Sequence, residues 1–303
     1  MGLRQPVVRR LAVAVPVTLL AIACDSGARV TGVPSQTNRG GRYPGFDIGT
    51  YPGDAALRAW RFPTSPYYWV GYYLAAPCHR DTTWLGKYQT LRDLGWGSAL
   101  LYVGQQDWAR VPDEILPSRA ESGRGTGPDN TGTSALLRAP ASVVCSASLL
   151  SSAQGALEAA DAADKAQREG FPRGSTIFLD VEYVTSVASP LRDYVAAWVA
   201  AVLSDGRYEP GIYCAKSNAA DFYQTASQAF AAAGRHDSPS FWIASSVGFS
   251  LDRQPTDVGL PYAAVWQGRF DVTESYGGVA RTIDADVAST PSPSAPITAV
   301  AGR

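Results

Sequence analysis

The chain has 303 residues, of which 46% are hydrophobic and 17% charged, and its formal net charge at pH 7 is -1. This length suffices for one large globular domain or two small ones. A nearly neutral chain has no general attraction to phosphate backbones, so the composition argues against a nucleic-acid-binding protein.

The first 24 residues are typical of an export signal. Arginines within the first ten residues precede an apolar run over residues 11–23, which is too short to span a bilayer comfortably. The run ends in Leu20-Ala-Ile-Ala-Cys24, which resembles a bacterial lipobox, where the cysteine is lipidated. We therefore predict a lipoprotein held at a membrane through Cys24. Ordinary secretion is the alternative, and both routes lead out of the cytoplasm.

Two polar segments flank the part of the chain that we expect to fold. Residues 25–42 are rich in Gly, Ser, Thr, Asn and Arg and lack an apolar period, which predicts a flexible linker. Residues 289–303 are rich in Pro, Ser and Ala, which predicts a disordered tail. Residues 43–288 are thus expected to form a single domain.

Strand-like and helix-like segments alternate within this domain. Residues 245–262 and 268–280 lack a good helical period and are expected to be short helices or loops. The helix-like segments are 54–60, 83–94, 149–169, 190–203 and 218–233. The strand-like segments are 45–48, 69–74, 98–103, 176–181, 211–214, 240–244, 263–267 and 281–285.

This order predicts an α/β fold, the (β/α)8 TIM-type barrel. Strands joined mostly by helical crossovers, in this number and over this length, are typical of that barrel. A doubly wound open sheet gives a similar pattern and is the alternative.

Acidic side chains follow several of the strand-like segments. Residues 175–183 form an apolar run that ends in Asp180 and Glu182. Because strand side chains alternate between faces, these two acids share a face, with Cα atoms roughly 6.5 to 7 Å apart. Asp47 and Asp284 end two other segments. Active sites of such barrels lie at the C-terminal ends of the strands, so we expect the four acids to form one site.

Polar and aromatic residues near the same strand ends are candidates for substrate binding. Aromatic side chains can pack in the core or offer a surface on which sugar rings stack. An acid near a strand end can also cap a helix or begin a turn, which is our interpretation of Asp54 and Asp286. The substrate-binding candidates are Asp47, Asp284, Gln105, Gln267, Tyr102, Tyr213, Trp242 and Trp266.

Paired carboxylates favour the hydrolysis of glycosidic bonds. One carboxyl group protonates the leaving oxygen, and another stabilises or attacks the oxocarbenium-like centre. Glu182 is the candidate acid because its longer side chain reaches further from the barrel. Asp180 is the candidate for positioning the substrate, orienting Glu182 or stabilising positive charge. The Cα spacing leaves both retention and inversion open.

Other chemistries find less support in the sequence. His79 and His236 are not spaced as a pair of metal ligands, although a carboxylate-only Mg²⁺ or Ca²⁺ site stays open. The chain has no Gly-x-Ser-x-Gly elbow and no nucleotide-binding glycine motif. We predict no metal and no cofactor.

Outside the cytoplasm, the remaining thiols are expected to oxidise. Once Cys24 is assigned to lipidation, Cys78, Cys145 and Cys214 allow three single pairings. We prefer a Cys78–Cys145 disulfide, because both residues lie in loop-like segments whereas Cys214 ends an apolar strand.

Short motifs in the predicted strands together resemble a known family. The similarity extends over residues 43–288 and is to the glycoside-hydrolase-like domain called domain of unknown function 1906, a relative of the family 25 glycoside hydrolase lysozymes. The motifs are Gly45-Phe-Asp47, Val70-Gly-Tyr-Tyr, Tyr102-Val-Gly-Gln105, Phe178-Leu-Asp180-Val-Glu182-Tyr, Gly211-Ile-Tyr213, Trp242-Ile-Ala, Val265-Trp-Gln267 and Ile283-Asp284-Ala-Asp286.

The resemblance implies a TIM-type barrel and, for the lysozyme relatives, cleavage of the β-1,4 bond after N-acetylmuramic acid in peptidoglycan. By position, it implies that Asp180 and Glu182 are the catalytic pair with Glu182 as the acid, and that Asp47 and Asp284 line the site. Trp266-Gln267 matches the aromatic-Gln pair on the seventh strand of the lysozymes.

These observations lead to one main hypothesis and one alternative. We expect an exported, glycoside hydrolase-like enzyme acting on peptidoglycan or another extracellular glycan. The alternative is a non-catalytic glycan-binding or cell-envelope maintenance protein on the same barrel. The expected partners are a glycan and, through the lipid anchor, a membrane.

Overall fold

The structure is a computed structural model, and it describes residues 41–108 and 145–296. The predicted export signal, Cys24 and nearly all of the predicted linker lie outside these residues. Within the described part of the chain, no helix is both long and apolar enough to cross a membrane.

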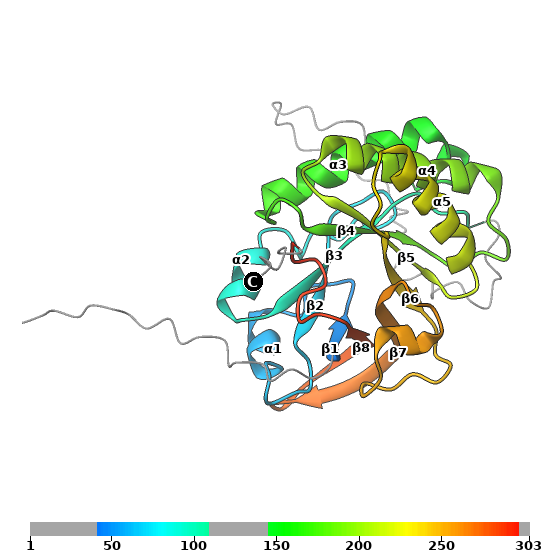
Figure 1. Cartoon of the computed structure of the whole chain (residues 1–303). Helices are drawn as coiled ribbons and strands as arrows, with labels where there is room; N and C mark the ends of the chain where they lie inside the picture. Colours follow the sequence, from blue (N-terminus) through cyan, green and yellow to red (C-terminus); the bar gives the residue numbers. More distant parts are fainter. Residues whose placement is uncertain (1–40, 109–144, 297–303) are drawn as a thin grey trace, which may run out of the picture. The chain divides into compact units, whose positions relative to one another are not determined.

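Eight strands of the described residues close into one barrel, in the order in which they occur in the sequence (Figure 1). The closed barrel confirms the predicted single-domain fold of the (β/α)8 TIM type and rules out the open sheet. The strands are β1 (Tyr43–Asp47), β2 (Trp69–Tyr73), β3 (Gly97–Val103), β4 (Thr176–Val181), β5 (Glu209–Ala215), β6 (Ser240–Ala244), β7 (Ala263–Tyr276) and β8 (Val279–Ala288).

The last strand runs against its neighbours. β8 is antiparallel to both β7 and β1, whereas the pairs from β1 to β7 are parallel. Residues 268–280, which we expected to be a short helix or loop, instead form most of β7, the turn after it and the first two residues of β8. The β7–β8 hairpin turns at Gly277 and Gly278, whose φ angles of 55° and 78° suit a two-residue hairpin turn. This direction brings Asp284 of β8 into register with Asp47 of β1.

Helices pack against the outside of the barrel, and α3, α4 and α5 lie together along one side of it in Figure 1. The helix predicted over residues 83–94 is shorter than expected. Gly86 has a positive φ of 73°, and the Asp81 carboxylate accepts a hydrogen bond from the Thr83 N–H, which holds a turn there. The helices are α1 (Asp54–Ala59), α2 (Tyr88–Asp93), α3 (Ser152–Glu169), α4 (Ser189–Asp205) and α5 (Ala219–Ala232), with short 3-10 turns η2 (Ala147–Leu149) and η3 (Pro255–Val258).

Aromatic rings fill the inside of the barrel. Trp69, Phe178 and Trp242 are fully buried, and the Trp242 ring centroid lies 5.4 Å from that of Trp69 and 5.7 Å from that of Phe178. Gly45 makes room for this packing, because a Cβ at that position would lie 2.1 Å from the Trp69 ring. The filled interior leaves the ends of the barrel as the places where chemistry can occur.

The amino end of the barrel, where β3 and β4 begin, is covered by residues 289–296. We expected a disordered tail over residues 289–303; this prediction was wrong for residues 289–296, and residues 297–303 lie outside the described residues. The Ser294 N–H donates to the Ser98 carbonyl at 3.0 Å, and the Ser294 carbonyl accepts from the Thr176 N–H at 3.1 Å. The tail thus joins β3 to β4, because it satisfies backbone groups that would otherwise be left at their edges.

Candidate active site

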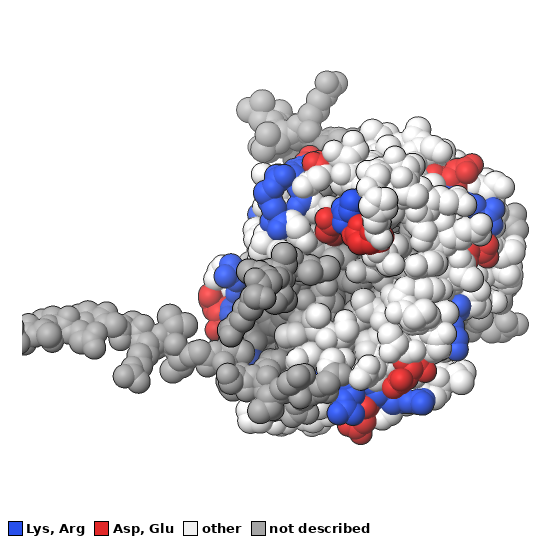
Figure 2. Space-filling view, in the orientation of Figure 1, with Lys and Arg blue, Asp and Glu red and all other residues white. Residues whose placement is uncertain are grey.

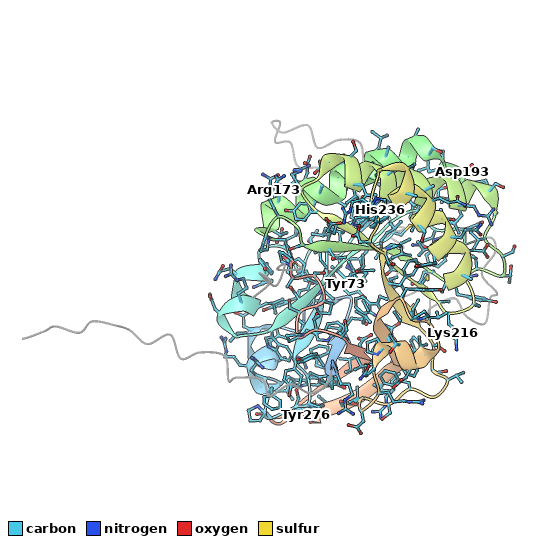
Figure 3. All side chains as sticks on the ribbon, viewed as in Figure 1. Tyr73, Arg173, Asp193, Lys216, His236 and Tyr276 are labelled. Atoms are coloured by element: carbon cyan, nitrogen blue, oxygen red, sulfur yellow. A yellow bond between two sulfur atoms is a disulfide. The ribbon has the colours of Figure 1, made fainter. Side chains whose placement is uncertain are left out.

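The carboxyl end of the barrel, where strands β1 to β7 finish, gathers acidic and polar side chains. In β4, Phe178 faces the interior and Leu179 packs towards the helices, so strand alternation turns Asp180 and then Glu182 inwards. Tyr73 of β2 lies in the middle of the barrel in Figure 3. The inward-facing polar residues at this end are Asp47, Tyr73, Asp180, Glu182, Tyr213, Gln267, Asp284 and Asp286.

Gln267 connects three strands at the centre of this cluster. Its Nε2 donates to Asp47 Oδ2 at 2.7 Å and to Asp284 Oδ2 at 3.1 Å. Its Oε1 accepts a hydrogen bond from the Tyr213 hydroxyl at 2.5 Å, which fixes the direction of the amide. The Tyr73 hydroxyl donates to Asp47 Oδ1 at 2.6 Å. Both oxygens of Asp47 are therefore held, which leaves this carboxylate in one orientation.

Asp180 and Glu182 are held through the side chain of Gln106. Gln106 Nε2 donates to the Asp180 carbonyl at 2.8 Å, and Gln106 Oε1 accepts from the Glu182 N–H at 2.9 Å. Asp180 is only 6% exposed, and its Oδ1 is buried without a hydrogen-bond partner among the described residues. Glu182 is partly exposed. Of the pair, Glu182 is the carboxyl that a substrate reaches first.

Asp286 lies deeper in the barrel than the acids at its end. It is fully buried, and its Oδ1 accepts a hydrogen bond from Trp242 Nε1 at 3.0 Å. Our interpretation of Asp286 as a cap or turn residue was wrong, because its side chain faces the interior two residues after Asp284. Trp242 is itself fully buried, so it supports the cluster from below and offers no ring to a ligand.

Burial raises the pKa values of the clustered carboxyl groups. Together with the charge of Asp47, burial raises the pKa of Glu182 to about 7. The pKa of Asp47 rises to about 6, with its hydrogen bonds opposing the effect of burial. The pKa of Asp284 rises to about 8 through burial and then Asp47. Burial and then Glu182 raise the pKa of Asp180 well above its usual range. Near neutral pH the cluster therefore retains protons.

Charges elsewhere on the protein are balanced, in contrast to this cluster. On the face shown in Figure 2, basic and acidic side chains lie next to one another around the edge. Arg207, for example, pairs with Asp164 and Asp205 at 2.8 Å each. No lysine or arginine among the described residues forms an ion pair with any carboxyl of the cluster. Shared protons, rather than basic side chains, limit its negative charge.

Two predicted substrate-binding residues at the end of β3 contact helix α3 and lie outside the cluster. The Tyr102 hydroxyl donates to Asp161 Oδ2 at 2.8 Å, and Gln105 Nε2 donates to Glu158 Oε1 at 2.7 Å. Both acids belong to α3, on the outside of the barrel. These two residues therefore anchor a helix, and their assignment to the site was wrong.

Trp266 also faces away from the cluster. It is fully buried, its Nε1 donates to the Ser245 carbonyl at 2.7 Å, and its ring packs edge-on against Phe249. Only the second residue of the aromatic-Gln pair, Gln267, faces the interior. The alternation of side chains along β7 explains the difference, since adjacent residues point to opposite faces.

Sequence reasoning missed Tyr73, Gln106 and Asp271, which complete the cluster. The Asp271 N–H donates to Asp284 Oδ1 at 2.7 Å. A signal for Tyr73 was present, because it lies four residues after the interior Trp69 on the same face of β2. Gln106 lies in a loop and Asp271 in a β-bulge. At such positions no periodicity in the sequence predicts which way a residue faces.

A disulfide lies close to the site. Cys78 and Cys145 are bonded, with Cα atoms 4.8 Å apart, which is the pairing we preferred. The bond joins the loop after β2 to the segment that leads into α3. His79 follows Cys78, and its ring centroid lies 4.8 Å from that of Tyr73. Of the described cysteines, Cys214 is free and buried.

Among the described residues, no group of three or more His, Cys, Asp or Glu side chains is arranged to hold a metal ion.

A barrel lined by carboxyl groups at this end is the architecture of a glycoside-hydrolase-like domain. Residues 58–288 match the family model described as Rv2525c-like, glycoside hydrolase-like domain. The match spans more than half of the chain, so the chain belongs to this family, and the resemblance seen in the sequence is confirmed. Asp47 on β1 precedes the matched residues. A comparison with curated proteins found no match.

Solved structures similar to this chain have low sequence identity. An uncharacterized protein of B. stearothermophilus is 17% identical with a TM-score of 0.51, over 81% of this chain and 95% of that chain. The Clostridium perfringens spore cortex lytic enzyme SleM is 12% identical with a TM-score of 0.46, over 82% of this chain and 67% of that chain. The Mycobacterium tuberculosis Tat-secreted protein Rv2525c is 15% identical with a TM-score of 0.43, over 80% of this chain and 94% of that chain. At such identities the first of these shows the fold alone.

Proposed function

We propose that this protein hydrolyses glycosidic bonds of peptidoglycan or another extracellular glycan, with Glu182 as the general acid. The observation that carries the proposal is the carboxyl cluster of Asp180, Glu182, Asp47 and Asp284, which has no basic partner among the described residues. Membership in a glycoside-hydrolase-like family supports the same reaction class.

Glu182 suits the acid role because of its exposure and its protonation. It is partly exposed, and because its pKa is about 7, the Glu182 carboxyl is protonated in a large share of the molecules near neutral pH. A general acid works best when its pKa lies near the working pH. Glu182 would give its proton to the glycosidic oxygen as the bond to the anomeric carbon breaks, and the leaving sugar departs as an alcohol.

The positive charge left on the sugar requires a neighbouring carboxylate. Asp47 ionises more readily than Glu182 and Asp284, because hydrogen bonds from Tyr73 and Gln267 stabilise its charged form. Asp47 would therefore stabilise the oxocarbenium-like centre. Asp180 would orient Glu182 and contact the substrate. A water molecule then completes the hydrolysis.

Export from the cytoplasm is part of the same proposal. The Cys78–Cys145 disulfide supports it, because disulfides persist in oxidising compartments. The lipobox-like run that ends at Cys24 supports a lipid anchor at a membrane. A membrane-anchored hydrolase would meet the cell wall or another glycan outside the cell.

The test is the release of soluble fragments from purified peptidoglycan by the full-length protein, followed by mass spectrometry of the new reducing ends. We expect muramic-acid reducing ends from the wild type and a loss of about 10² to 10⁴ in rate for Glu182→Gln. Glu209→Gln is the matched control, since Glu209 begins β5 at the opposite end of the barrel and pairs with Arg235 at the surface. Its rate should be unchanged.

The non-catalytic alternative predicts a different result. If the wild type binds peptidoglycan saturably but releases no fragments, and the double variant Asp180→Asn and Glu182→Gln binds equally well, the protein is a glycan-binding module. Equal fragment release by the wild type and Glu182→Gln would contradict the assigned acid while leaving hydrolysis intact.

A further inference from the structure

Strand β7 contains a bulge directly opposite Asp284. Its register with β8 shifts between Gln267 and Arg269 and again between Arg269 and Val272. Within this stretch Asp271 has a φ of 50°, which is uncommon for a residue other than glycine. Its N–H donates to Asp284 Oδ1 at 2.7 Å. Bulges and unusual backbone conformations concentrate beside active sites, and this one holds an acid of the cluster.

Phe270 occupies the bulge immediately before Asp271, and 42% of it is exposed. A lone exposed aromatic residue is ordinary on a protein surface, so its exposure alone decides nothing. The position of Phe270 distinguishes it, because the N–H of the next residue, Asp271, donates to Asp284 and so holds the backbone of Phe270 beside the cluster. Val247, which is 78% exposed, lies in the loop after β6, and Phe249 of that loop packs against the start of the bulge.

The neighbouring cluster restricts the ligand that can cover Phe270. The acids have no basic partner among the described residues, so an anionic group placed beside Asp284 would find no cation to pair with. An uncharged ligand with an apolar face needs no such partner. A pyranose ring is such a ligand, because its C–H face packs on aromatic rings while its hydroxyl groups stay free to form hydrogen bonds.

We propose that Phe270 is a sugar-binding platform on which an uncharged pyranose ring of the glycan stacks beside Asp284. This inference rests on the proposed function, since it places the sugar next to the acids assigned to hydrolysis. It adds a binding residue from the β7 bulge, which lies outside the set identified in the sequence. The bulge then has two roles: its backbone orients Asp284, and Phe270 binds the sugar.

The test measures the binding of soluble, uncharged strands of β-1,4-linked N-acetylglucosamine to the full-length protein carrying Glu182→Gln. This background removes the proposed acid, so that the strands stay intact during calorimetry. Adding Phe270→Ala should weaken binding roughly tenfold, a typical effect of losing one buried aromatic contact. Phe270→Trp should restore the affinity. Leu157→Ala is the control, since Leu157 is 66% exposed on α3 and should leave the affinity unchanged.

The outcomes separate this inference from the proposed function. If fragment release proceeds with the same KM in the wild type and in Phe270→Ala, hydrolysis stands and the platform is overturned. If strands bind through Phe270 but the wild type releases no fragments, hydrolysis falls and the platform stands. Affinity that is unchanged in Phe270→Ala, equally reduced in Leu157→Ala, or absent in the parent protein overturns the platform.

Discussion

The two ends of the barrel treat buried polar groups in different ways. At the amino end, Ser294 of the tail uses its backbone and its hydroxyl to satisfy β3 and β4. At the carboxyl end, the buried Asp180 has a carboxyl oxygen without a hydrogen-bond partner among the described residues, whereas the buried group without such a partner at the amino end is a neutral hydroxyl, that of Ser175. Unpaired buried groups oppose folding. The amino end therefore stabilises the fold, whereas the buried carboxyl groups at the carboxyl end destabilise it and are available for chemistry.

A single methyl group at the carboxyl end should disturb the cluster itself. In Gly71→Ala the new Cβ would lie 2.5 Å from Asp47 Cβ and 3.2 Å from Leu101 Cδ1. Asp47 must then move away from Tyr73 and Gln267. We expect fragment release to fall at least about tenfold and the free energy of unfolding to fall by about 1–3 kcal/mol. Turnover assays and urea unfolding measure the two effects.

The matching change at the amino end should affect stability alone. In Gly97→Ala the new Cβ would lie 1.9 Å from the Pro291 carbonyl oxygen, so the tail must shift. We expect a loss of about 1–3 kcal/mol in the free energy of unfolding. The rate per folded molecule should equal that of the wild type. A loss of rate as large as in Gly71→Ala would contradict the division between the two ends.

The carboxyl end should make stability depend on pH. The folded-state pKa values of Asp47, Glu182 and Asp284 lie above the unfolded values. Folding therefore takes up protons, and the stability that these groups contribute is present at low pH and is lost as pH rises through about 6 to 8. Burial lowers the pKa of His79, which opposes this trend below its unfolded pKa.

Scanning calorimetry at about pH 6 and about pH 8 tests this dependence. We expect a higher Tm at the lower pH and a smaller difference in Asp284→Asn, because the amide cannot ionise. Asp221→Asn is the control, since this exposed acid lies on α5, outside the cluster, and pairs with Arg192. A wild-type Tm that rises towards the higher pH would show that the cluster ionises freely.

Ser294→Ala should have the smallest effect. The variant removes the hydroxyl that accepts a hydrogen bond from the Leu100 N–H at 2.7 Å but keeps the backbone bonds of the tail. We expect a loss of about 1 kcal/mol in the free energy of unfolding and no change in fragment release. Thr290→Ala, at an exposed position of the same tail, should be neutral.

The sequence predicted the barrel and the position of its main acids because their signals are local. The apolar run before Asp180 and Glu182 indicates a strand, and their spacing indicates a shared face. β3 lacks such a signal, because it is apolar on both faces. Tyr102 faces α3, where its hydroxyl donates to Asp161, a contact that no period within β3 predicts.

The β7–β8 hairpin and the order of the tail were mispredicted for different reasons. The pair Gly277-Gly278 between two alternating runs is a hairpin signal, and it predicts that the last strand is antiparallel to the strand before it. The tail carries no comparable signal. Ser294 is ordered because the edges of β3 and β4 offer it backbone hydrogen bonds, which depend on the folded barrel and not on the composition of the tail.

The most direct test of this account is the titration of Glu182 in the free protein. Carbon-13 NMR of protein labelled at the glutamate carboxyl carbon, with Glu182→Gln to assign the signal, reports the pKa without a substrate. We predict a midpoint at about 7, because burial and the charge of Asp47 hold the proton on Glu182. A midpoint near its ordinary value of 4.5 would contradict the claim that the carboxyl end of the barrel keeps an acid ready for glycosidic bond cleavage.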